Sequence, residues 1–237
     1  MERILKDNTN KIWVNTSNQI IKEIPFSEIT AVNGKIVEYI GGNVNNIGGF
    51  SNIWYDSVGN NNLIQNNATF QYRIMNSGDY PSLKSVDING ITKNSYMALT
   101  TGISYYSCIM VVRHTGYLTM SPVSNGGGNG LFFGANANVK LYISDTTGAN
   151  KNGIRGDTWI NGVKNNNYTS PLIIGNIYII GVNMYSLFPI TANLIGMYTG
   201  YFRQGEEILH IALFNKIQKD AEMTYSMNAL KTKYNVI

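Results

Sequence analysis

The sequence predicts an all-β fold, a two-sheet antiparallel sandwich that ends in one C-terminal α-helix. Two observations carry most of the prediction: the dipeptide Asn-Gly recurs along the chain, and apolar residues come in many short runs. Asn-Gly is the strongest two-residue hairpin signal, because both central residues of a type I′ turn need a positive φ. The repeated pair therefore indicates antiparallel strands joined by tight turns. The pairs begin at Asn33, Asn89, Asn125, Asn129, Asn152 and Asn161.

The short apolar runs between these turns predict a dozen or more strands. A chain of many short strands is typical of a β-sandwich, in which two sheets enclose one interior. The candidate strands are Lys11–Asn15, Ile36–Ile40, Asn52–Tyr55, Thr69–Met75, Ser85–Ile88, Tyr96–Leu99, Tyr106–Arg113, Tyr117–Ser121, Gly130–Gly134, Val139–Ser144, Thr158–Ile160, Leu172–Ile174, Ile177–Val182 and Glu207–Phe214.

The end of the chain supplies a third observation, a buried strand followed by the one helix. From Glu207 to Phe214 the apolar residues fall on both faces, as in a strand that is covered on both sides. The apolar spacing then changes to two to four residues, which predicts an amphipathic helix. Acidic residues come early in this helix and lysines late, which matches the helix dipole. The expected buried face consists of Ala221, Met223, Met227, Leu230 and Tyr234.

Composition limits the domain count and suggests a surface chemistry. The 237 residues suffice for one large β domain or two small ones. Only 14% of them are charged, whereas there are 33 Asn, 24 Gly and 16 Tyr. The simpler explanation of the asparagine excess is an AT-rich genome. The functional explanation is a surface of amides and aromatic rings, which suits sugar hydroxyls.

Charge and hydropathy argue against several classes of partner. The net charge is +4 and the basic residues are scattered, so we expect no nucleic-acid partner. Residues 165–202 carry no charge, but Asn, Gly and Pro interrupt them before about 18 apolar residues accumulate, so we expect no membrane insertion. The first eleven residues lack the apolar run of a secretory signal. The single cysteine, Cys108, is expected to be a small buried strand residue.

Several separated motifs occur in an order known from one family. They are IWYDSVGNNN at 53–62, PSL at 81–83 with Asn-Gly at 89–90, WING at 159–162, PLIIG at 171–175, and the ending from 208 to 234. Together they resemble the concanavalin A-like (laminin G-type) lectin/glucanase domains over about residues 50–237. The segment IWVNTS at 12–17 is similar to the first strand of that family.

The resemblance implies a jelly-roll-like sandwich of two facing antiparallel sheets. Domains of this family commonly bind glycans, and many are found on phage virions and bacterial surface proteins. We accordingly divide the chain into an N-terminal segment, residues 1–40, and a sandwich domain, residues 41–237. The N-terminal segment would attach the protein to a virion or supply the first strands of the sandwich.

The carboxylates do not form a recognisable catalytic pair. Retaining glycosidases place two carboxyl groups about 5–5.5 Å apart, which on one strand face means residues two or four apart. Only Asp220 and Glu222 have this spacing, and they lie at the predicted helix start, where acids favour the helix dipole. We therefore expect no catalytic residue and no enzyme activity. A pair assembled from distant strands stays an open alternative.

A calcium ion is the one cofactor that the sequence leaves possible. Calcium takes loop carbonyls together with one or two carboxylates. Asp56, in the turn between Trp54 and Asn62, and Asp157 or Asp145, near the loop at 148–156, are candidate ligands. The alternative for Asp56, which we favour, is an Asx-type hydrogen bond to its own turn.

Candidate glycan-binding residues combine aromatic rings with amides. Trp159, Tyr168 and the run from Asn165 to Asn167 cluster around one predicted hairpin, and Tyr105 and Tyr106 form a second aromatic pair. The alternative is that Trp159 fills the core and the asparagines face solvent. The two interpretations of Trp159 carry equal weight.

These observations lead to a functional hypothesis. We expect a non-enzymatic phage virion component, a fibre or surface protein that presents a glycan-binding, host-adhesion domain. Its partners would be a bacterial surface glycan, other virion proteins and further copies of the chain, and its location the virion. One alternative is a glycoside hydrolase or lyase that degrades polysaccharide. Another is a purely structural capsid or tail decoration protein.

Overall fold

The structure is a computed structural model, and it describes part of the chain. The backbone is described at residues 5–6, 11–14, 20–22, 34–75, 80–86, 89, 95–115, 119–124, 130–135, 141–145, 156–164, 173–184, 190–195, 197–198, 201–202 and 207–237. Side chains are described at 34–75, 80–86, 89, 95–115, 157–164, 173–183 and 207–237.

Strands make up most of the described chain, and one α-helix follows the last of them. The elements are β1 (Leu5–Lys6), β2 (Lys11–Val14), β3 (Ile20–Lys22), β4 (Lys35–Val44), β5 (Phe50–Ser51), β6 (Ile53–Asp56), β7 (Leu63–Ile64), the 3-10 helix η1 (Ala68–Phe70), β8 (Tyr72–Met75), β9 (Ser82–Lys84), β10 (Met97–Tyr105), β11 (Ser107–Arg113), β12 (Thr119–Ser124), β13 (Gly130–Ala135), β14 (Leu141–Asp145), β15 (Gly156–Ile160), β16 (Val163–Lys164), β17 (Ile177–Met184), β18 (Ile190–Ile195), β19 (Met197–Tyr198), β20 (Tyr201–Phe202), β21 (Glu207–Phe214) and α2 (Asp220–Lys233).

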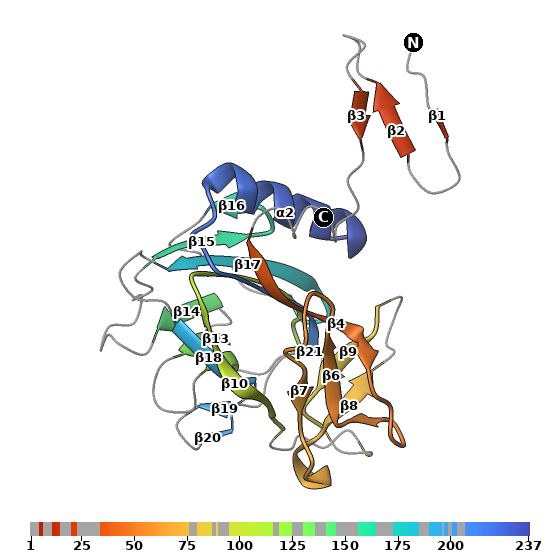
Figure 1. The fold of residues 1–237 in the computed structure, drawn as a ribbon, viewed down its shortest axis with the longest axis vertical. Helices are drawn as coiled ribbons and strands as arrows, with labels where there is room; N and C mark the ends of the chain where they lie inside the picture. The colour runs from red at the N-terminus through yellow and green to blue at the C-terminus, as the bar shows by residue number, and fades with distance from the viewer. Residues whose placement is uncertain are drawn as a thin grey trace.

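The main strands form two layers connected by one hydrogen-bonded path (Figure 1). The first layer has the order β16-β15-β17-β11-β21-β4, and the second has the order β14-β13-β12-β18-β10. β6 and β7 link β4 of the first layer to β10 of the second, and a branch of β9, β8 and β5 joins β21. The pairings along this path are antiparallel. The predicted all-β sandwich with one C-terminal helix is therefore confirmed.

The central strands of the first layer are buried on both faces, as the apolar runs predict. In β11, Cys108, Met110 and Val112 face the interior between the layers, while Ile109 and Val111 face the opposite side. Every residue of β21 is buried. The alternation gives this layer one core shared with the second layer and another core beneath α2.

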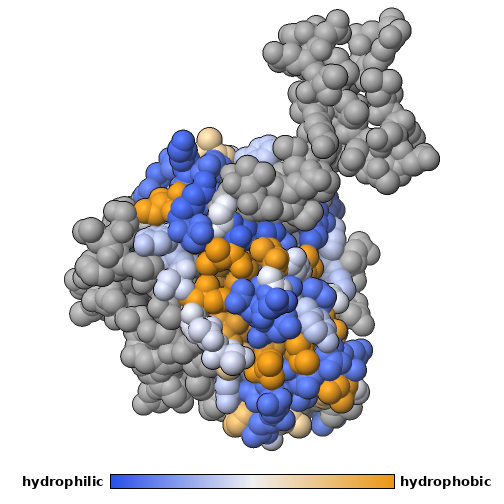
Figure 2. Space-filling model, in the orientation of Figure 1, coloured by the Kyte–Doolittle hydropathy of each residue, from blue (hydrophilic) through white to orange (hydrophobic). Residues whose placement is uncertain are grey.

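Helix α2 lies on the outer face of the first layer (Figure 1). Met223, Met227 and Leu230 are completely buried against the sheet. Gly181 in β17 admits this close packing, because a Cβ there would lie 2.8 Å from the sulfur atoms of both Met223 and Met227. The predicted helix is confirmed, except that Ala221 is exposed instead of buried. Figure 2 shows hydrophilic residues where the N-terminal part of the helix is visible.

A bulge in β21 sets the direction of one buried histidine. Val111 pairs with His210 and Val112 pairs with Ile208, so that Leu209 is the extra residue between them. Because of the bulge, Leu209 and His210 both face the helix side, and the Nδ1 atom of His210 lies 3.1 Å from the hydroxyl oxygen of Tyr234.

The hairpin signal is confirmed where its residues are described. Asn161 and Gly162 both have positive φ, 49° and 84°, and they connect β15 to β16. Gly34 has a φ of 76° and precedes β4. The other Asn-Gly pairs, at Asn33, Asn89, Asn125, Asn129 and Asn152, include residues outside the described part of the chain.

One expected strand is wrong where its residues are described, and another lies partly outside the described residues. Leu172–Ile174 was expected to be a strand, but residues 173–176 form a turn, and Ile173 and Ile174 are 62% and 68% exposed. Of the expected strand Ser85–Ile88, residues 87 and 88 lie outside the described part of the chain, and the described strand is β9, immediately upstream, which pairs with β8 and β21. Strands of two residues, such as β5 and β16, carry too few residues to show a pattern.

The expected boundary at residue 40 falls inside β4. This strand begins at Lys35 and pairs with β21 from Lys35 to Ile40, so residues 35–40 belong to the sandwich. Further upstream, β1, β2 and β3 form their own three-stranded antiparallel sheet. Among the described residues, no helix is long and apolar enough to cross a membrane.

Candidate functional site

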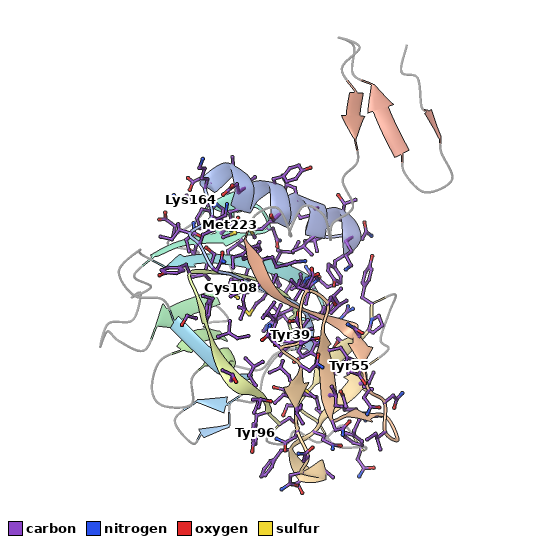
Figure 3. The ribbon with its side chains drawn as sticks, in the orientation of Figure 1. Tyr39, Tyr55, Tyr96, Cys108, Lys164 and Met223 are labelled. Carbon is purple, nitrogen blue, oxygen red and sulfur yellow. The ribbon has the colours of Figure 1, made fainter. Side chains whose placement is uncertain are left out.

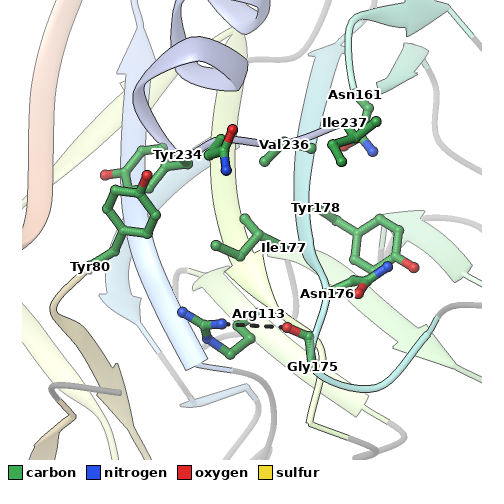
Figure 4. A pocket seen from close by; sticks show the side chains of 11 residues that line it. Tyr80, Arg113, Asn161, Gly175, Asn176, Ile177, Tyr178, Tyr234, Val236 and Ile237 are labelled. Atoms are coloured by element: carbon green, nitrogen blue, oxygen red, sulfur yellow. Dashed lines mark hydrogen bonds between the residues drawn. The ribbon is translucent and has the colours of Figure 1, made fainter. Parts of the chain in front are cut away.

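A cavity of about 380 Å³ opens beyond the C-terminal end of α2 (Figure 4). The helix ends at Lys233, and the segment after it turns across the sheet without covering it fully. The volume falls within the range of about 300–1,000 Å³ that is usual for ligand pockets. The cavity is lined by Tyr80, Arg113, Asn161, Gly175, Asn176, Ile177, Tyr178, Tyr234, Asn235, Val236 and Ile237.

Three tyrosine rings form much of the cavity wall. Tyr80 and Tyr234 lie on one side, with ring centroids 5.1 Å apart in an edge-to-face arrangement. Tyr178, in β17, lies on the opposite side of the opening in Figure 4. Its hydroxyl accepts a 2.8 Å hydrogen bond from the backbone N–H of Ile173, so its own proton can still be donated.

Amide side chains add hydrogen-bonding groups beside these rings. The Oδ1 atom of Asn161 accepts a 2.9 Å hydrogen bond from the N–H of Ile179, which fixes the direction of the amide and leaves its NH₂ group as a donor. The positive φ of Asn161 in the β15–β16 turn brings this side chain to the cavity. Asn176 and Asn235 line it as well. Aromatic walls with a few directed polar groups are the usual composition of a small-ligand site.

Arg113 is the charged side chain among the lining residues that the structure describes, and a buried carboxylate anchors it on the side away from the cavity. Its Nε atom lies 3.2 Å from Oε2 of Glu207, a residue buried at the start of β21. One of its terminal nitrogens, Nη1, donates a long 3.4 Å hydrogen bond to the carbonyl of Gly175, as drawn in Figure 4. The side chain keeps 20% of its surface exposed. The guanidinium group is therefore held in place and still reaches the cavity.

A buried polar network holds Tyr234 from the side away from the cavity. The Nε2 atom of His210 lies 3.0 Å from Oε1 of Glu38, and Lys35 donates a hydrogen bond to the other oxygen of that carboxylate. A carboxylate only accepts, so Nε2 carries the proton and Nδ1 accepts from the hydroxyl of Tyr234. Burial would raise the pKa of Glu38, but the hydrogen bond from His210 and the ion pair with Lys35 lower it to about 2.

The same network keeps His210 neutral. Its ring is completely buried, and desolvation lowers the pKa of His210 below its ordinary value of 6.5, against the opposing influence of Glu38. Burial also raises the pKa of Tyr234 well above its ordinary value. Tyr234 thus stays a protonated donor whose ring position is set by β4 and β21.

The aromatic residues expected to bind a glycan lie mainly in the core. Trp159 is fully buried beneath α2. The Nζ atom of Lys164, which is labelled near α2 in Figure 3, lies 5.1 Å from the centre of the Trp159 ring. Tyr105 is fully buried between the two layers, and Tyr106 is half-buried. For Trp159 and Tyr105 the structure supports the core interpretation, because no part of either ring reaches solvent. The remaining predicted ligand residues, Asn165, Asn166 and Tyr168, lie outside the described residues.

The carboxylates proposed for calcium have other partners. Asp56 accepts hydrogen bonds from the backbone N–H groups of Glu38, Val58 and Asn61 at 3.0, 2.9 and 3.2 Å. This is the turn-stabilising arrangement, extended to β4. Asp157 pairs with Lys164 at 2.8 Å. The described residues contain no group of three or more His, Cys, Asp or Glu that could hold a metal ion.

The cavity residues were not recognisable as a group in the sequence. They come from the segment before β9, the end of β11, the β15–β16 turn, the start of β17 and the segment after α2. Asn161 was noticed only as a turn residue and Tyr234 only as a member of the helix face. No local spacing connects these positions, since only the pairing of β11 with β17 and β21 brings them together.

Comparisons with known proteins identify distant structural similarity. No family model matches the chain, and no curated protein matches it. Among solved structures, the chain is similar to Trypanosoma rangeli sialidase, with a TM-score of 0.42 and 10% sequence identity. The match covers 96% of this chain but 43% of the sialidase, so the chain spans less than half of that protein.

This comparison corrects one expectation of the sequence analysis. We expected a protein without enzyme activity, whereas a solved structure that the chain matches is an enzyme. The expectation of a non-enzyme is therefore withdrawn. A likeness at this TM-score and identity assigns neither an activity nor a ligand to the chain, and the function proposed below rests on the cavity alone.

Proposed function

We propose that this chain is a glycan-binding domain built on a concanavalin A-like sandwich, and that the cavity beyond α2 is its ligand site. The supporting observation is the composition of the cavity, where the rings of Tyr80, Tyr178 and Tyr234 stand beside the amides of Asn161 and Asn176. Aromatic rings pack against the apolar C–H faces of a sugar, while amides exchange hydrogen bonds with its hydroxyls.

The wider role that we propose is host adhesion by a phage fibre or surface protein. In this role the domain would bind a bacterial surface glycan, and other virion proteins or further copies of the chain would hold it on the particle. The motif resemblance to concanavalin A-like domains supports this part of the proposal. Binding to host cells, co-sedimentation with virions and light scattering of the purified protein test it separately from glycan binding.

A glycan array with two matched tyrosine variants tests the ligand site. Tyr80→Ala removes one wall of the cavity, whereas Tyr55→Ala removes a tyrosine that is 38% exposed on β6 and does not line it. An aromatic contact contributes about 0.5–1.5 kcal/mol, so Tyr80→Ala is expected to weaken glycan binding by up to about tenfold. Tyr55→Ala is expected to bind like the wild type.

Two results would contradict the proposal. The first is a wild-type protein that binds no glycan on the array or on host cells. The second is equal binding by the wild type and Tyr80→Ala, with melting temperatures confirming that both are folded. In that case any glycan site lies elsewhere on the molecule.

A further inference from the structure

The turn between β15 and β16 contains Asn161-Gly162, a dipeptide that can react with itself. The backbone nitrogen of the glycine can attack the side-chain amide carbon of the asparagine, because glycine has no side chain to hinder the approach. The new N–C bond closes a five-membered succinimide ring, and the amide nitrogen leaves as ammonia with the proton of the glycine N–H. Water then opens the ring to aspartate or isoaspartate. The sequence by itself therefore makes Asn161 a reactive residue.

The backbone of the folded turn keeps the two reacting atoms apart. The φ values of Asn161 and Gly162, 49° and 84°, are those of a type I′ turn, in which ψ of the first central residue is about +30°. Ring closure needs the glycine nitrogen on the same side of the Cα–C bond as the asparagine Cβ. A ψ of about +30° turns that nitrogen to the opposite side. The reaction therefore requires the turn to change its conformation.

Two hydrogen bonds to β17 hold Asn161 in this unreactive arrangement. Its backbone N–H donates to the carbonyl of Ile179 at 2.8 Å, and its Oδ1 atom accepts from the N–H of Ile179 at 2.9 Å. The side-chain amide thus takes the place of a strand carbonyl and is directed at β17. Rotation of the amide toward the nitrogen of Gly162 would break the second bond.

Helix α2 and Lys164 hold the turn from the other side. The Nζ atom of Lys164 lies 2.8 Å from Oδ2 of Asp157 on β15 and 3.0 Å from Oδ2 of Asp220 at the start of α2. The helix also packs directly on the turn, because a Cβ at Gly162 would lie 2.7 Å from Oδ1 of Asn228. Opening the turn therefore means releasing it from both β17 and α2.

We propose that Asn161 is a latent deamidation site, which the closed β15–β16 hairpin protects and which reacts when the hairpin opens. In the open state ψ of Asn161 can rotate, and the succinimide forms with loss of ammonia. Isoaspartate adds one carbon atom to the backbone, so a turn that contains it cannot return to the type I′ geometry. The modification thus makes a transient opening of the hairpin permanent. The chemistry is independent of the proposed function, and only its effect on glycan binding rests on that proposal, since Asn161 lines the cavity.

Trypsin isolates this site in one short peptide. Cleavage after Arg155 and Lys164 releases residues 156–164, in which Asn161 carries the only side-chain amide. The wild-type protein would be incubated at mildly alkaline pH, folded or unfolded in urea, while mass spectrometry follows deamidation of this peptide. Asn161 should react about tenfold or more slowly in the folded protein, which corresponds to an opening free energy of about 1.4 kcal/mol or more. Equal rates in the folded and unfolded protein would overturn the proposal.

Two lysine variants test whether opening of the hairpin controls the reaction. Lys164→Ala removes the ion pairs that join β16 to β15 and α2, whereas Lys216→Ala removes a similarly exposed lysine that pairs with Glu222. Folded Lys164→Ala should deamidate at Asn161 about twofold to fivefold faster than the wild type, as the loss of exposed ion pairs allows. Lys216→Ala should react like the wild type. Fragment masses locate the modification in Lys164→Ala, whose tryptic peptide continues to residue 203.

The outcomes separate this inference from the proposed function. A rate in Lys164→Ala no higher than in Lys216→Ala would overturn the control by hairpin opening, with melting temperatures confirming that both variants are folded. If Lys164→Ala does not fold, the wild-type comparison still decides whether the fold protects Asn161. Glycan binding by the incubated wild type is a separate measurement. Unchanged binding by fully deamidated protein would contradict the proposed ligand site and leave the deamidation result intact.

Discussion

The two ends of helix α2 are fixed to the sheet by different chemistry. At the N-terminal end, buried neutral hydroxyl and amide groups are hydrogen-bonded to one another, and the ion pairs of Lys164 with Asp220 and of Lys216 with Glu222 lie at more exposed positions around them. The C-terminal end is held by a charged network of lysine, glutamate and histidine, and the cavity opens beside it. The same helix therefore has one closed end and one end that leaves room for a ligand.

At the N-terminal end, three buried residues tie two strands to the segment that leads into the helix. The Nδ2 atom of Asn183 donates a 2.6 Å hydrogen bond to the carbonyl of Gln218, and its Oδ1 atom lies 2.6 Å from the hydroxyl of Ser107. The backbone N–H of Gln218 in turn donates to Ser107 Oγ at 3.0 Å. Glu222 closes the first turn by accepting from the backbone N–H of Lys219 at 2.9 Å.

At the C-terminal end, the chain from Lys35 through Glu38 and His210 ends on Tyr234, whose ring is a cavity wall. The buried groups at the N-terminal end are neutral, whereas those at the C-terminal end are charged and hold in place a residue of the proposed binding site. Three changes test this comparison, in order of expected effect.

Replacing Asn183 by alanine should have the largest effect on stability. The variant loses two short hydrogen bonds and leaves the buried carbonyl of Gln218 and the hydroxyl of Ser107 without this partner. Each unpaired buried group costs about 1–3 kcal/mol, so the free energy of unfolding should fall by about 2–5 kcal/mol. Urea denaturation measures the change.

Asn228→Ala is the matched control for this variant. Asn228 is an exposed asparagine on α2, and surface substitutions of this kind usually change stability by less than about 0.5 kcal/mol. If Asn183→Ala is no less stable than Asn228→Ala, the neutral network does not hold the N-terminal end, and the comparison between the two ends loses its basis.

Acid should weaken the C-terminal end selectively, because that end depends on an ionised carboxylate. The pKa of Glu38 is about 2 in the folded protein, against an ordinary value of 4.5. Between these values the unfolded chain binds more protons, so this contribution to stability is present above pH 4.5 and is lost as the pH falls toward 2. The shift corresponds to a contribution on the order of 3 kcal/mol.

Urea denaturation of the wild type and of Glu38→Gln at a series of pH values measures this contribution. The variant should be less stable near neutral pH and should lose less stability on acidification than the wild type. The lowered pKa of His210 acts in the same direction, since its buried neutral ring resists protonation as the pH falls through 6.5. Parallel curves for the two proteins would show that Glu38 does not stabilise the folded state through its charge.

Tyr234→Phe should have the smallest effect and should separate stability from binding. It removes the hydroxyl that pairs with Nδ1 of His210 and keeps the ring that lines the cavity. One buried acceptor loses its partner, so unfolding should become easier by about 1–2 kcal/mol. Glycan affinity should change less than about twofold. Tyr225→Phe, at a tyrosine 51% exposed on the same helix, should change neither quantity.

Glycan binding in Tyr234→Phe could fall as much as in Tyr80→Ala. This result would change the comparison between the two ends of α2. It would mean that the hydroxyl, through His210 and Glu38, sets the position of the cavity wall. Melting temperature and binding, measured on the same samples, distinguish the two cases.

The spacing of apolar residues and the turn-forming Asn-Gly pairs were enough to predict the architecture from the sequence. The apolar residues on both faces from Glu207 to Phe214 require a strand that is covered twice. The spacing of Met223, Met227 and Leu230 requires one helix face to be buried. Asn161-Gly162 requires a tight hairpin, because both residues adopt a positive φ there. Each of these features involves residues that are close together in the sequence, so it can be recognised without the structure.

Only the tertiary structure decided which polar and aromatic residues meet at a site. Asn183 interrupts an apolar run in the sequence, and the fold gives it partners on β11 and before α2. Trp159 is equally suited to a core and to a binding site, and the position of α2 over its ring places it in the core. Arg113 and Tyr234 are 121 positions apart, and the pairing of β11 with β21 and the packing of α2 bring both to one cavity. Contacts between distant segments depend on sheet order and helix docking, which leave no periodic trace along the chain.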